Sequence, residues 1–322
     1  MREGEANEEH EGPPVRESGP DIHVVIATKD RPDLLRRTLG SLARCDRPPH
    51  FSSVVVVENG GGSGARDVCR DAPASLNVRY EPFARANKCA ALNHVLEQLS
   101  DGLLLFLDDD VRATDGLLSA YARAAEGVSG GVFYGGPVAP DYEVPPPEWL
   151  VAFLPPSTKG WSREHDGEGF VDEPVFLGAN WAAFAGDLRR VGGFDASMGP
   201  GSVSGSLGDE TDMQARLLAV GVQGRYVPEA LVYHWVPRER STPSWALERI
   251  YRHGIWCGLR GRPDVPRLFG RPRWAVRRSV QSWLAAQVWR LHPDPGRRFA
   301  ARASHAWVRG VLRGARQAAD RV

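Results

Sequence analysis

Three consecutive aspartates, Asp108-Asp109-Asp110, are the residues of this 322-residue chain with the clearest chemical potential. They follow the apolar run Leu103–Leu107, which has the composition of a buried strand. Adjacent carboxylates at the end of a buried strand repel one another and are costly unless a positive group neutralises them. A divalent cation does so with the hard oxygen ligands it prefers, completed by water and substrate phosphates. The sequence therefore favours a metal–diphosphate site over a solvated acidic loop or a cap for the next helix.

A second acidic group, Asp209-Glu210-Thr211-Asp212, opens another predicted helix. Carboxylates in the first turn of a helix are stabilised by its macrodipole, and the spacing of Asp209 and Asp212 resembles a capping box. This structural interpretation would be sufficient on its own. However, the group follows the Gly/Ser-rich segment 196–208, and beside a mobile loop it could reach a substrate and act as a general base. The residues alone leave both interpretations open.

Three further candidates each carry a structural alternative. Lys88 stands near the start of a predicted helix, where it could meet a phosphate or a substrate hydroxyl, or be a surface lysine. Asn180-Trp181 could form a wall on which a sugar stacks, or could pack in the core. His234 follows a short predicted strand and could be a ligand or a structural histidine.

Alternating strands and helices are predicted to position these residues. Short β-branched apolar runs predict strands, and helical spacing of apolar residues predicts helices. The strands are expected at 21–28, 53–58, 77–80 and 103–107, and the helices at 32–42, 65–71, 88–99 and 115–125. Thr114 or Asp115 is expected to cap the last of these helices. The alternation predicts βαβ units, and hence an α/β fold with a mostly parallel sheet and helices on both faces.

Polar side chains stand where the predicted strands end. Thr28 and Asp30 follow the first strand, Glu58 and Asn59 follow the second, and the three aspartates follow the strand at 103–107. In open α/β sheets, ligands bind outside the carboxyl ends of the strands. Pattern and position therefore agree on a ligand site at this edge of the sheet.

The composition is that of a globular protein, with 42% hydrophobic and 25% charged residues, and the length predicts about two domains. The four cysteines lie far apart without a CxxC pair, which predicts free thiols in a reducing compartment. No apolar run approaches the roughly 20 residues of a membrane helix, and the acidic segment 1–20 lacks the apolar core of a secretory signal. The expected location is the cytoplasm.

The net charge of zero conceals two opposite parts. Residues 1–240 carry 23 Lys and Arg against 36 Asp and Glu, whereas residues 241–322 carry 17 Arg against 4 Asp and Glu. The C-terminal part contains Arg/Trp-rich amphipathic stretches such as 274–291. Two interpretations stay open: peripheral contact with an anionic membrane, at the inner face of the plasma membrane, or packing against the acidic part of the chain. No recognition motif supports nucleic-acid binding, and none is expected.

The motifs together resemble a known family. The segments VVIATKDRPDLLRRTL, VVVVENGG, NKCAALN, LLLFLDDDV, GANWAAF…VGGFD and GDETDMQAR occur in the order and spacing of the family 2 glycosyltransferases of GT-A fold. The resemblance covers residues 21–237. It implies a GT-A domain at 21–240, whereas composition predicts a disordered acidic tail at 1–20 and a basic, Arg/Trp-rich helical extension at 241–322. Within the GT-A domain, 21–138 would bind the nucleotide sugar and 139–240 the acceptor.

The resemblance implies transfer of a sugar, with inversion, from a nucleoside-diphosphate donor to an acceptor hydroxyl. Asp108 and Asp110 match the D-x-D motif that binds the Mn²⁺ or Mg²⁺ bridging the diphosphate, and His234 would be a further metal ligand. Where the family usually carries Asp for the nucleoside, this chain carries Glu58. The donor-binding residues implied are Thr28, Asp30, Glu58, Asn59, Lys88, Asp108 and Asp109.

The resemblance also implies a catalytic base and an acceptor site. The family's usual Glu-Asp pair appears here as Asp209-Glu210, so Glu210 takes the base position and Asp209 is the alternative. Asn180, Trp181 and Asp212 would contact the acceptor, which could be a saccharide, a lipid-linked molecule or a small molecule. Ordering of the 196–208 loop would exclude water from the site.

Two other functions remain as alternatives. A sugar-phosphate nucleotidyltransferase would share the nucleotide-binding sheet, but the chain lacks a Gly/Arg/Lys-rich loop after the first strand to hold a triphosphate. A non-catalytic module that binds nucleotide sugars or glycans would show binding without turnover. The D-x-D motif and the acidic pair argue against the loss of catalytic residues that a non-catalytic module would show. The favoured role is glycan or glycoconjugate biosynthesis.

Overall fold

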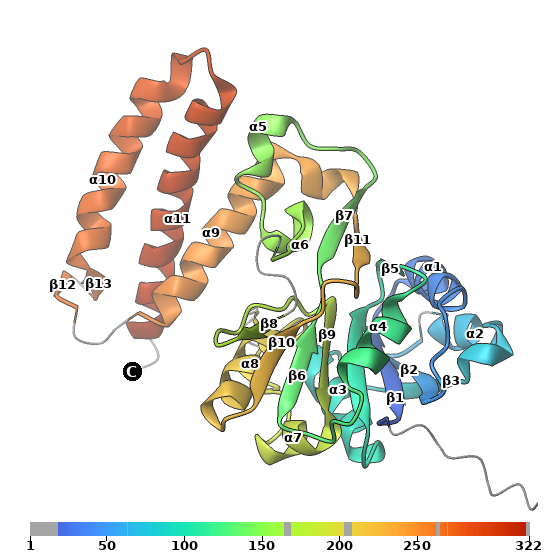
Figure 1. Ribbon diagram of the computed structural model, residues 1–322. Helices are drawn as coiled ribbons and strands as arrows, with labels where there is room; N and C mark the ends of the chain where they lie inside the picture. The colour runs from blue at the N-terminus through green and yellow to red at the C-terminus, as the bar shows by residue number, and fades with distance from the viewer. Residues whose placement is uncertain are drawn as a thin grey trace, which may run out of the picture.

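A computed structural model of the chain describes residues 19–62, 64–163, 169–202, 208–261, 265–268 and 270–319. Its centre is an eight-stranded sheet (Figure 1). In spatial order the strands are β3 (Val78–Phe83), β2 (Phe51–Asn59), β1 (Ile22–Thr28), β4 (Leu103–Asp108), β9 (Asn180–Phe184), β6 (Val132–Gly135), β10 (Gln223–Tyr226) and β8 (Gly169–Val171). The first four run parallel, β9 is antiparallel to both of its neighbours, and β8 is antiparallel to β10.

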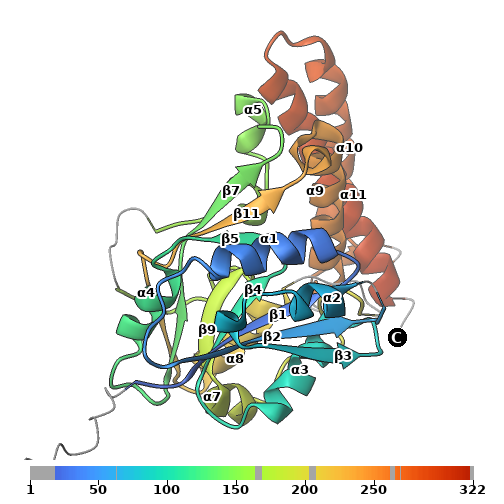
Figure 2. The same cartoon turned by 90° about the vertical axis from the view of Figure 1, so that its right-hand side faces the viewer.

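Helices cover both faces of this sheet. They are α1 (Pro32–Leu42), α2 (Ala65–Arg70), α3 (Lys88–Gln98), α4 (Leu117–Ala124), α7 (Ala185–Arg190) and α8 (Asp209–Ala219), with a 3₁₀ turn, η1 (Ala74–Leu76), before β3. Side chains alternate along a strand, so Val24 and Ile26 of β1 enter the core beneath α1, α2 and α4. Val25 enters the opposite core, beneath α3, α7 and α8. Figure 2 shows α1 and α3 on opposite sides of the parallel strands.

The predicted fold class is confirmed, because the expected strands and helices of the N-terminal half are β1–β4 and α1–α4, with ends within three residues of those expected. The predicted helix cap is wrong. The residue that caps α4 is Gly116, without a side-chain hydrogen bond, because Thr114 Oγ1 instead donates to the Leu231 carbonyl at 2.8 Å. The capping box proposed for α8 is also absent, since Gly208 precedes the helix and Asp209 is its first residue.

A small second sheet joins distant parts of the chain at the end of β4. It contains β5 (Val111–Ala113), β11 (Val232–Val236) and β7 (Val138–Tyr142), in that order. The Pro-rich segment 140–156 contains the end of β7 and the short helix α5 (Glu148–Val151), and α6 (Pro156–Lys159) begins at its last residue. Because β11 pairs with β5, His234 lies opposite Val111, next to the three aspartates.

The C-terminal part is helical. It contains η2 (Arg238–Ser241), α9 (Pro243–Leu259), the short hairpin β12 (Arg267–Leu268) and β13 (Arg271–Pro272), α10 (Arg273–Val288), η3 (Trp289–Leu291) and α11 (Pro295–Ala319). None of the helices in the described residues combines the length and apolar character needed to cross a membrane.

Helices α9 and α11 pack backbone to backbone at paired glycines. A Cβ built on Gly254 would lie 2.2 Å from the Trp307 carbonyl oxygen, and one on Gly314 would lie 2.1 Å from that of Ile255. A side chain at either position would therefore separate the two helices. A small core beneath α5 joins α9 and α11 to the rest of the chain. Its buried members are Leu150, Leu154, Ala246, Phe299 and Ala303.

Candidate active site

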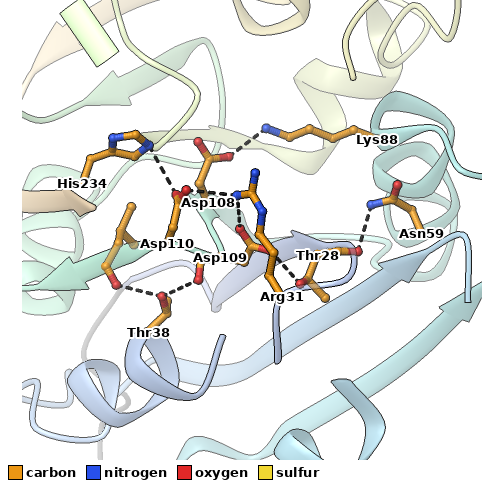
Figure 3. Close-up of polar contacts among 10 residues, drawn as sticks. Thr28, Arg31, Thr38, Asn59, Lys88, Asp108, Asp109, Asp110 and His234 are labelled. Carbon is orange, nitrogen blue, oxygen red and sulfur yellow. Dashed lines mark hydrogen bonds and ion pairs between the residues drawn. The ribbon is translucent and has the colours of Figure 1, made fainter. Parts of the chain in front are cut away.

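The three aspartates lie at the carboxyl end of β4, at the edge of the sheet where ligands were expected (Figure 3). Asp109 and Asp110 are buried, and Asp108 is partly exposed. Thr28 Oγ1 donates to Asp109 Oδ2 at 2.7 Å. Burial raises the pKa of Asp109 to about 6, although this hydrogen bond and the charge of Arg31 oppose the shift. The turn thus concentrates negative charge where the chain can neutralise it only in part.

Arg31 is a residue of this site that sequence reasoning missed. One of its terminal nitrogens lies 3.1 Å from Asp109 Oδ1 and 3.0 Å from Asp110 Oδ2. The turn before it includes Asp30, whose φ of 55° is in the left-handed region. The available signal was its position directly after the first strand, where the guanidinium can reach the neighbouring strand end. Arg31 offsets part of the charge of the acidic turn.

Asp108, Asp110 and His234 form a three-residue group whose ligand atoms lie within 4.8 Å of one another. His234 Nε2 lies 3.3 Å from Asp110 Oδ1. Within the described part of the chain, Asp110 Oδ1 and His234 Nδ1 are buried without a hydrogen-bond partner. Burial lowers the pKa of His234, but the adjacent Asp110 carboxylate outweighs it and raises the pKa overall. Two carboxylates and an imidazole, one of whose carboxylate oxygens is buried without a hydrogen bond, are a donor set that fits Mn²⁺ or Mg²⁺.

Lys88 is not a surface lysine. It is the first residue of α3, where the Asn87 side chain caps the helix by accepting from the Ala90 N–H at 2.9 Å. Its ammonium lies 2.8 Å from Asp108 Oδ1. Burial opposes the charge on Lys88, but the carboxylates of Asp108 and Asp209 outweigh burial and raise its pKa. Burial alone would raise the pKa of Asp108, but the charge of Lys88 outweighs burial, and the pKa of that carboxyl is lowered.

Glu210 and Asp209 reach the same place from α8. With Lys88 they line a cavity of about 10 Å³, the size that holds a single water molecule. Burial, followed by the charge of Asp209, raises the pKa of Glu210 to about 7, against the opposing charge of Lys88. Gly178 faces the Glu210 carboxyl, and a Cβ there would lie 3.5 Å from its Cδ. A half-buried carboxyl whose pKa is raised to about 7 is the kind of group that serves as a general base.

A basic residue from outside the predicted GT-A domain lies within electrostatic range of the Glu210 carboxyl. Burial lowers the pKa of Arg249 on α9, and the charge of Glu210 partly offsets that effect. Sequence patterns did not predict this interaction, because residues 241–322 lie outside the motifs that carry the resemblance. Helix α9 therefore contributes charge to the site as well as packing.

The predicted nucleoside-binding residues lie along the ends of β1 and β2. Thr28 and Asn59 are buried, and Asn59 Nδ2 donates to the Thr28 carbonyl at 3.0 Å. Glu58 is buried as well and accepts a 2.5 Å hydrogen bond from the Tyr80 hydroxyl. Asp30 is exposed at the rim. The structure gathers these residues beside the aspartates, and their contact with a nucleoside remains a prediction.

The predicted acceptor residues are placed differently. Asn180 is fully buried: it accepts from the Tyr121 hydroxyl and donates to the carbonyls of Pro137 and Ala230. Trp181 is 1% exposed and stacks on a neighbouring phenylalanine of β4, forming one wall of the cavity beside Glu210. These positions favour core packing, the alternative that the sequence had left open. Contact of either side chain with an acceptor remains a prediction.

Asp212 forms an ion pair within its own helix, α8. Its carboxylate accepts from Arg216 Nε at 2.8 Å, one turn along α8, and Arg216 also donates to the Val191 carbonyl. This ion pair ties α8 to the end of α7. A role in acceptor binding remains a prediction for Asp212.

Replacing Asn180 by Ala should lower the free energy of unfolding by about 3 kcal/mol, because it leaves the two carbonyls and the Tyr121 hydroxyl buried without their partner. Urea unfolding of the variant and of Gln281→Ala, at an exposed helical position, measures the difference. A stable Asn180→Ala protein with impaired transfer would contradict the packing role and support acceptor contact.

Residues 203–207 of the predicted closing loop lie outside the described residues. The described part of that loop contacts the start of α3. Asn87 Nδ2 donates to the Ala196 carbonyl at 2.8 Å, and the Lys88 N–H donates to the Pro200 carbonyl at 3.1 Å. The loop thus begins directly beside Lys88, and its closure over a substrate remains a prediction.

Comparisons with known proteins identify the family. The family model described as glycosyltransferase like family 2 matches residues 20–254. A validoxylamine A glucosyltransferase of Streptomyces hygroscopicus subsp. limoneus is 31% identical over 257 residues, which are 71% of this chain and 51% of the relative. The succinoglycan biosynthesis protein ExoM of Rhizobium meliloti (strain 1021) is 27% identical over 237 residues, 72% of either protein. The chain therefore spans about half the length of the glucosyltransferase.

Solved structures show the same fold. The mannosyltransferase PcManGT from Pyrobaculum calidifontis, in complex with GDP-Man and Mn²⁺, is similar at a TM-score of 0.58 and 16% identity, over 92% of this chain and 87% of that one. The structure of GalNAc-T7 with UDP, GalNAc and Mn²⁺ is similar at a TM-score of 0.53 and 12% sequence identity. The match covers 76% of this chain and 51% of that one. These likenesses show the GT-A fold. Because the family match spans most of the chain, the protein belongs to the family 2-like glycosyltransferases.

Proposed function

We propose that the protein transfers a sugar from a nucleoside-diphosphate donor to an acceptor hydroxyl, with inversion at the anomeric carbon. The observation that carries this proposal is the position of Glu210. Its carboxyl, with a pKa raised to about 7, shares a cavity with Lys88, and the Lys88 ammonium contacts Asp108 of the D-x-D motif. A proton acceptor thus lies beside the group that would hold the donor diphosphate, as a single displacement requires.

Asp108, Asp110 and His234 would hold the divalent cation. Asp110 Oδ1 supports this assignment, because it is buried, has no hydrogen-bond partner among the described residues and lies 3.3 Å from His234 Nε2, so that one cation would satisfy both atoms. When bound, the metal stabilises the charge that develops on the leaving diphosphate. Whether the ion is Mn²⁺ or Mg²⁺ depends on the ligands that substrate and water add.

The chain's own residues carry the remaining steps. Glu210, in its ionised form, takes the proton of the acceptor hydroxyl while that oxygen bonds to the anomeric carbon. The bond from that carbon to the diphosphate breaks on the opposite face, and the nucleoside diphosphate leaves. Lys88 and Arg31 contact the aspartates in the structure described above. With donor bound, they would supply positive charge next to its phosphates. Asp209 strengthens the base by raising the pKa of Glu210.

The acceptor is proposed by class. One relative is named for glucosyl transfer to validoxylamine A, and another for biosynthesis of succinoglycan. The acceptors to test are therefore a small molecule, a saccharide and a lipid-linked molecule. We place the reaction in glycan or glycoconjugate biosynthesis. The four cysteines are free thiols, which suits the reducing cytoplasm as its location.

A thermal-shift panel tests the donor site. UDP, GDP, dTDP and CDP are each added with Mn²⁺, with Mg²⁺ or with a chelator. One nucleotide should raise the melting temperature by about 5 °C at about 100 times its dissociation constant, and only with metal, because ligands that bind the native state stabilise it by mass action.

The panel and a turnover assay separate the alternatives. Binding of a nucleoside diphosphate without turnover of any of its sugars would favour the non-catalytic module. Release of pyrophosphate from a nucleoside triphosphate and a sugar phosphate would favour the nucleotidyltransferase. If no nucleotide shifts the melting temperature with either metal, the proposed donor site is wrong.

A further inference from the structure

Exposed apolar side chains gather on one part of the C-terminal helices. Among the described residues, eleven large hydrophobic side chains are exposed, and seven of them lie between Trp274 and Leu291. Val288 and Leu291 are 79% and 89% exposed. Such a concentration on one surface marks an interaction site, whereas single exposed apolar residues do not.

Helix α10 has one face packed against α11 and, among the described residues, one face that stays exposed. Ala275 and Ser282 are buried against α11, where Ser282 Oγ lies 3.1 Å from His305 Nδ1. Residues on a helix advance by about 100° each, so Val280, Leu284 and Val288 form a stripe on the opposite side. Figure 1 shows α10 on the side of α11 that faces away from the central sheet. The stripe therefore looks outward from the molecule.

The outward surface is strongly basic. Residues 273–298 contain six arginines and one carboxylate, Asp294. By the same helical geometry, Arg273 and Arg277 continue the stripe toward the start of α10, and both are exposed. Tryptophan and arginine around an exposed apolar stripe are typical of helices that lie in a membrane interface.

We propose that the outer face of α10, from Arg273 to Leu291, docks on an anionic lipid surface. Val280, Leu284, Val288 and Leu291 would enter the boundary between headgroups and acyl chains, while the arginines contact lipid phosphates. Charge selects this occupant, because residues 273–291 contain four arginines and no carboxylate, so two copies of the same face would bring four arginines against four. Docking would hold the catalytic sheet beside a membrane without a spanning helix.

Co-sedimentation of the full chain with vesicles tests the proposal. Phosphatidylcholine vesicles are compared with vesicles that also contain phosphatidylglycerol. The protein should bind the anionic vesicles, and added salt should weaken binding. The double variant Leu284→Asp/Val288→Asp should bind at least about tenfold more weakly, because it removes two apolar anchors and adds two repelled charges. Its melting temperature should be unchanged, since both side chains are exposed.

Phe170→Asp is the matched control, because Phe170 is 62% exposed on β8, outside the helical part. That variant should bind vesicles like the parent chain. Equal binding by the α10 double variant, or no binding of the parent chain to anionic vesicles, would overturn the proposal. So would a dimer in sedimentation velocity that Leu284→Asp dissociates, since it would assign the stripe to a second copy. The assay contains no donor, so its outcome is independent of the proposed reaction.

Discussion

Replacing Glu210 by Gln should lower the rate of sugar transfer by about 10²- to 10⁴-fold while nucleotide binding is retained. The amide keeps the size of the side chain but cannot accept the acceptor proton. The Glu210 side chain lies beside Lys88 and Asp209 and is not part of the group Asp108, Asp110 and His234 that would hold the metal. Transfer kinetics with saturating donor, together with the nucleotide thermal shift, measure the two effects separately.

The pH profile provides a second measurement on the same carboxyl. The pKa of Glu210 is raised to about 7 by burial and by the charge of Asp209. A base acts in its ionised form, so kcat/KM should fall as the pH drops below about 7 and should level off above it. The Asp209→Asn variant removes the neighbouring charge, so the midpoint should move to lower pH.

Glu126→Gln is the control for these experiments, because Glu126 is exposed and distant in the chain from both acidic groups. That variant should transfer sugar at the parent rate. Unaltered turnover of Glu210→Gln would exclude Glu210 as the base. If Asp209→Asn abolishes transfer and Glu210→Gln does not, the base is Asp209.

Replacing Asp110 by Asn should weaken Mn²⁺ binding by about 100-fold or more, and with it the metal-dependent part of nucleotide binding. Asp110 provides the buried oxygen that has no hydrogen-bond partner among the described residues and lies 3.3 Å from His234 Nε2. The variant keeps the shape of the side chain and removes its charge. Titration calorimetry with Mn²⁺ alone measures the loss without requiring turnover.

Asp33→Asn serves as the control, because Asp33 is exposed on α1 and pairs only with the nearby Arg36 among the described residues. It should bind Mn²⁺ as the parent chain does. Parent-like Mn²⁺ affinity in Asp110→Asn would remove Asp110 from the metal site. The His234→Ala variant should lose less affinity than Asp110→Asn, since a neutral imidazole contributes no charge.

The sequence alone determined the sheet and its functional edge. Apolar β-branched runs alternate with helical patterns, and this local periodicity requires only neighbouring residues. Because parallel strands share one carboxyl edge, Thr28, Glu58 and the aspartates could be expected together before any coordinates were known. The ordered motifs predicted the family, which the family match confirms.

The tertiary structure decided what depends on residues far apart in the chain. His234 meets Asp110 only because β11 pairs with β5, and Lys88 meets Asp108 only because α3 begins at the edge where β4 ends. Local pattern holds no information on such pairings. The same holds for Arg31, whose partners lie 78 and 79 residues away.

Burial was likewise settled only by packing. Asn180 has a polar side chain that suits a binding site, yet its three hydrogen bonds join strands and loops that are distant in sequence, and they allow it to be fully buried. In the basic C-terminal part, composition predicted helices but not which face would be covered. Close contact of α9 and α11 at their glycines leaves α10 on the outside, with its apolar stripe exposed. An amphipathic sequence specifies that a face is apolar, whereas only the arrangement of its neighbours specifies what covers that face.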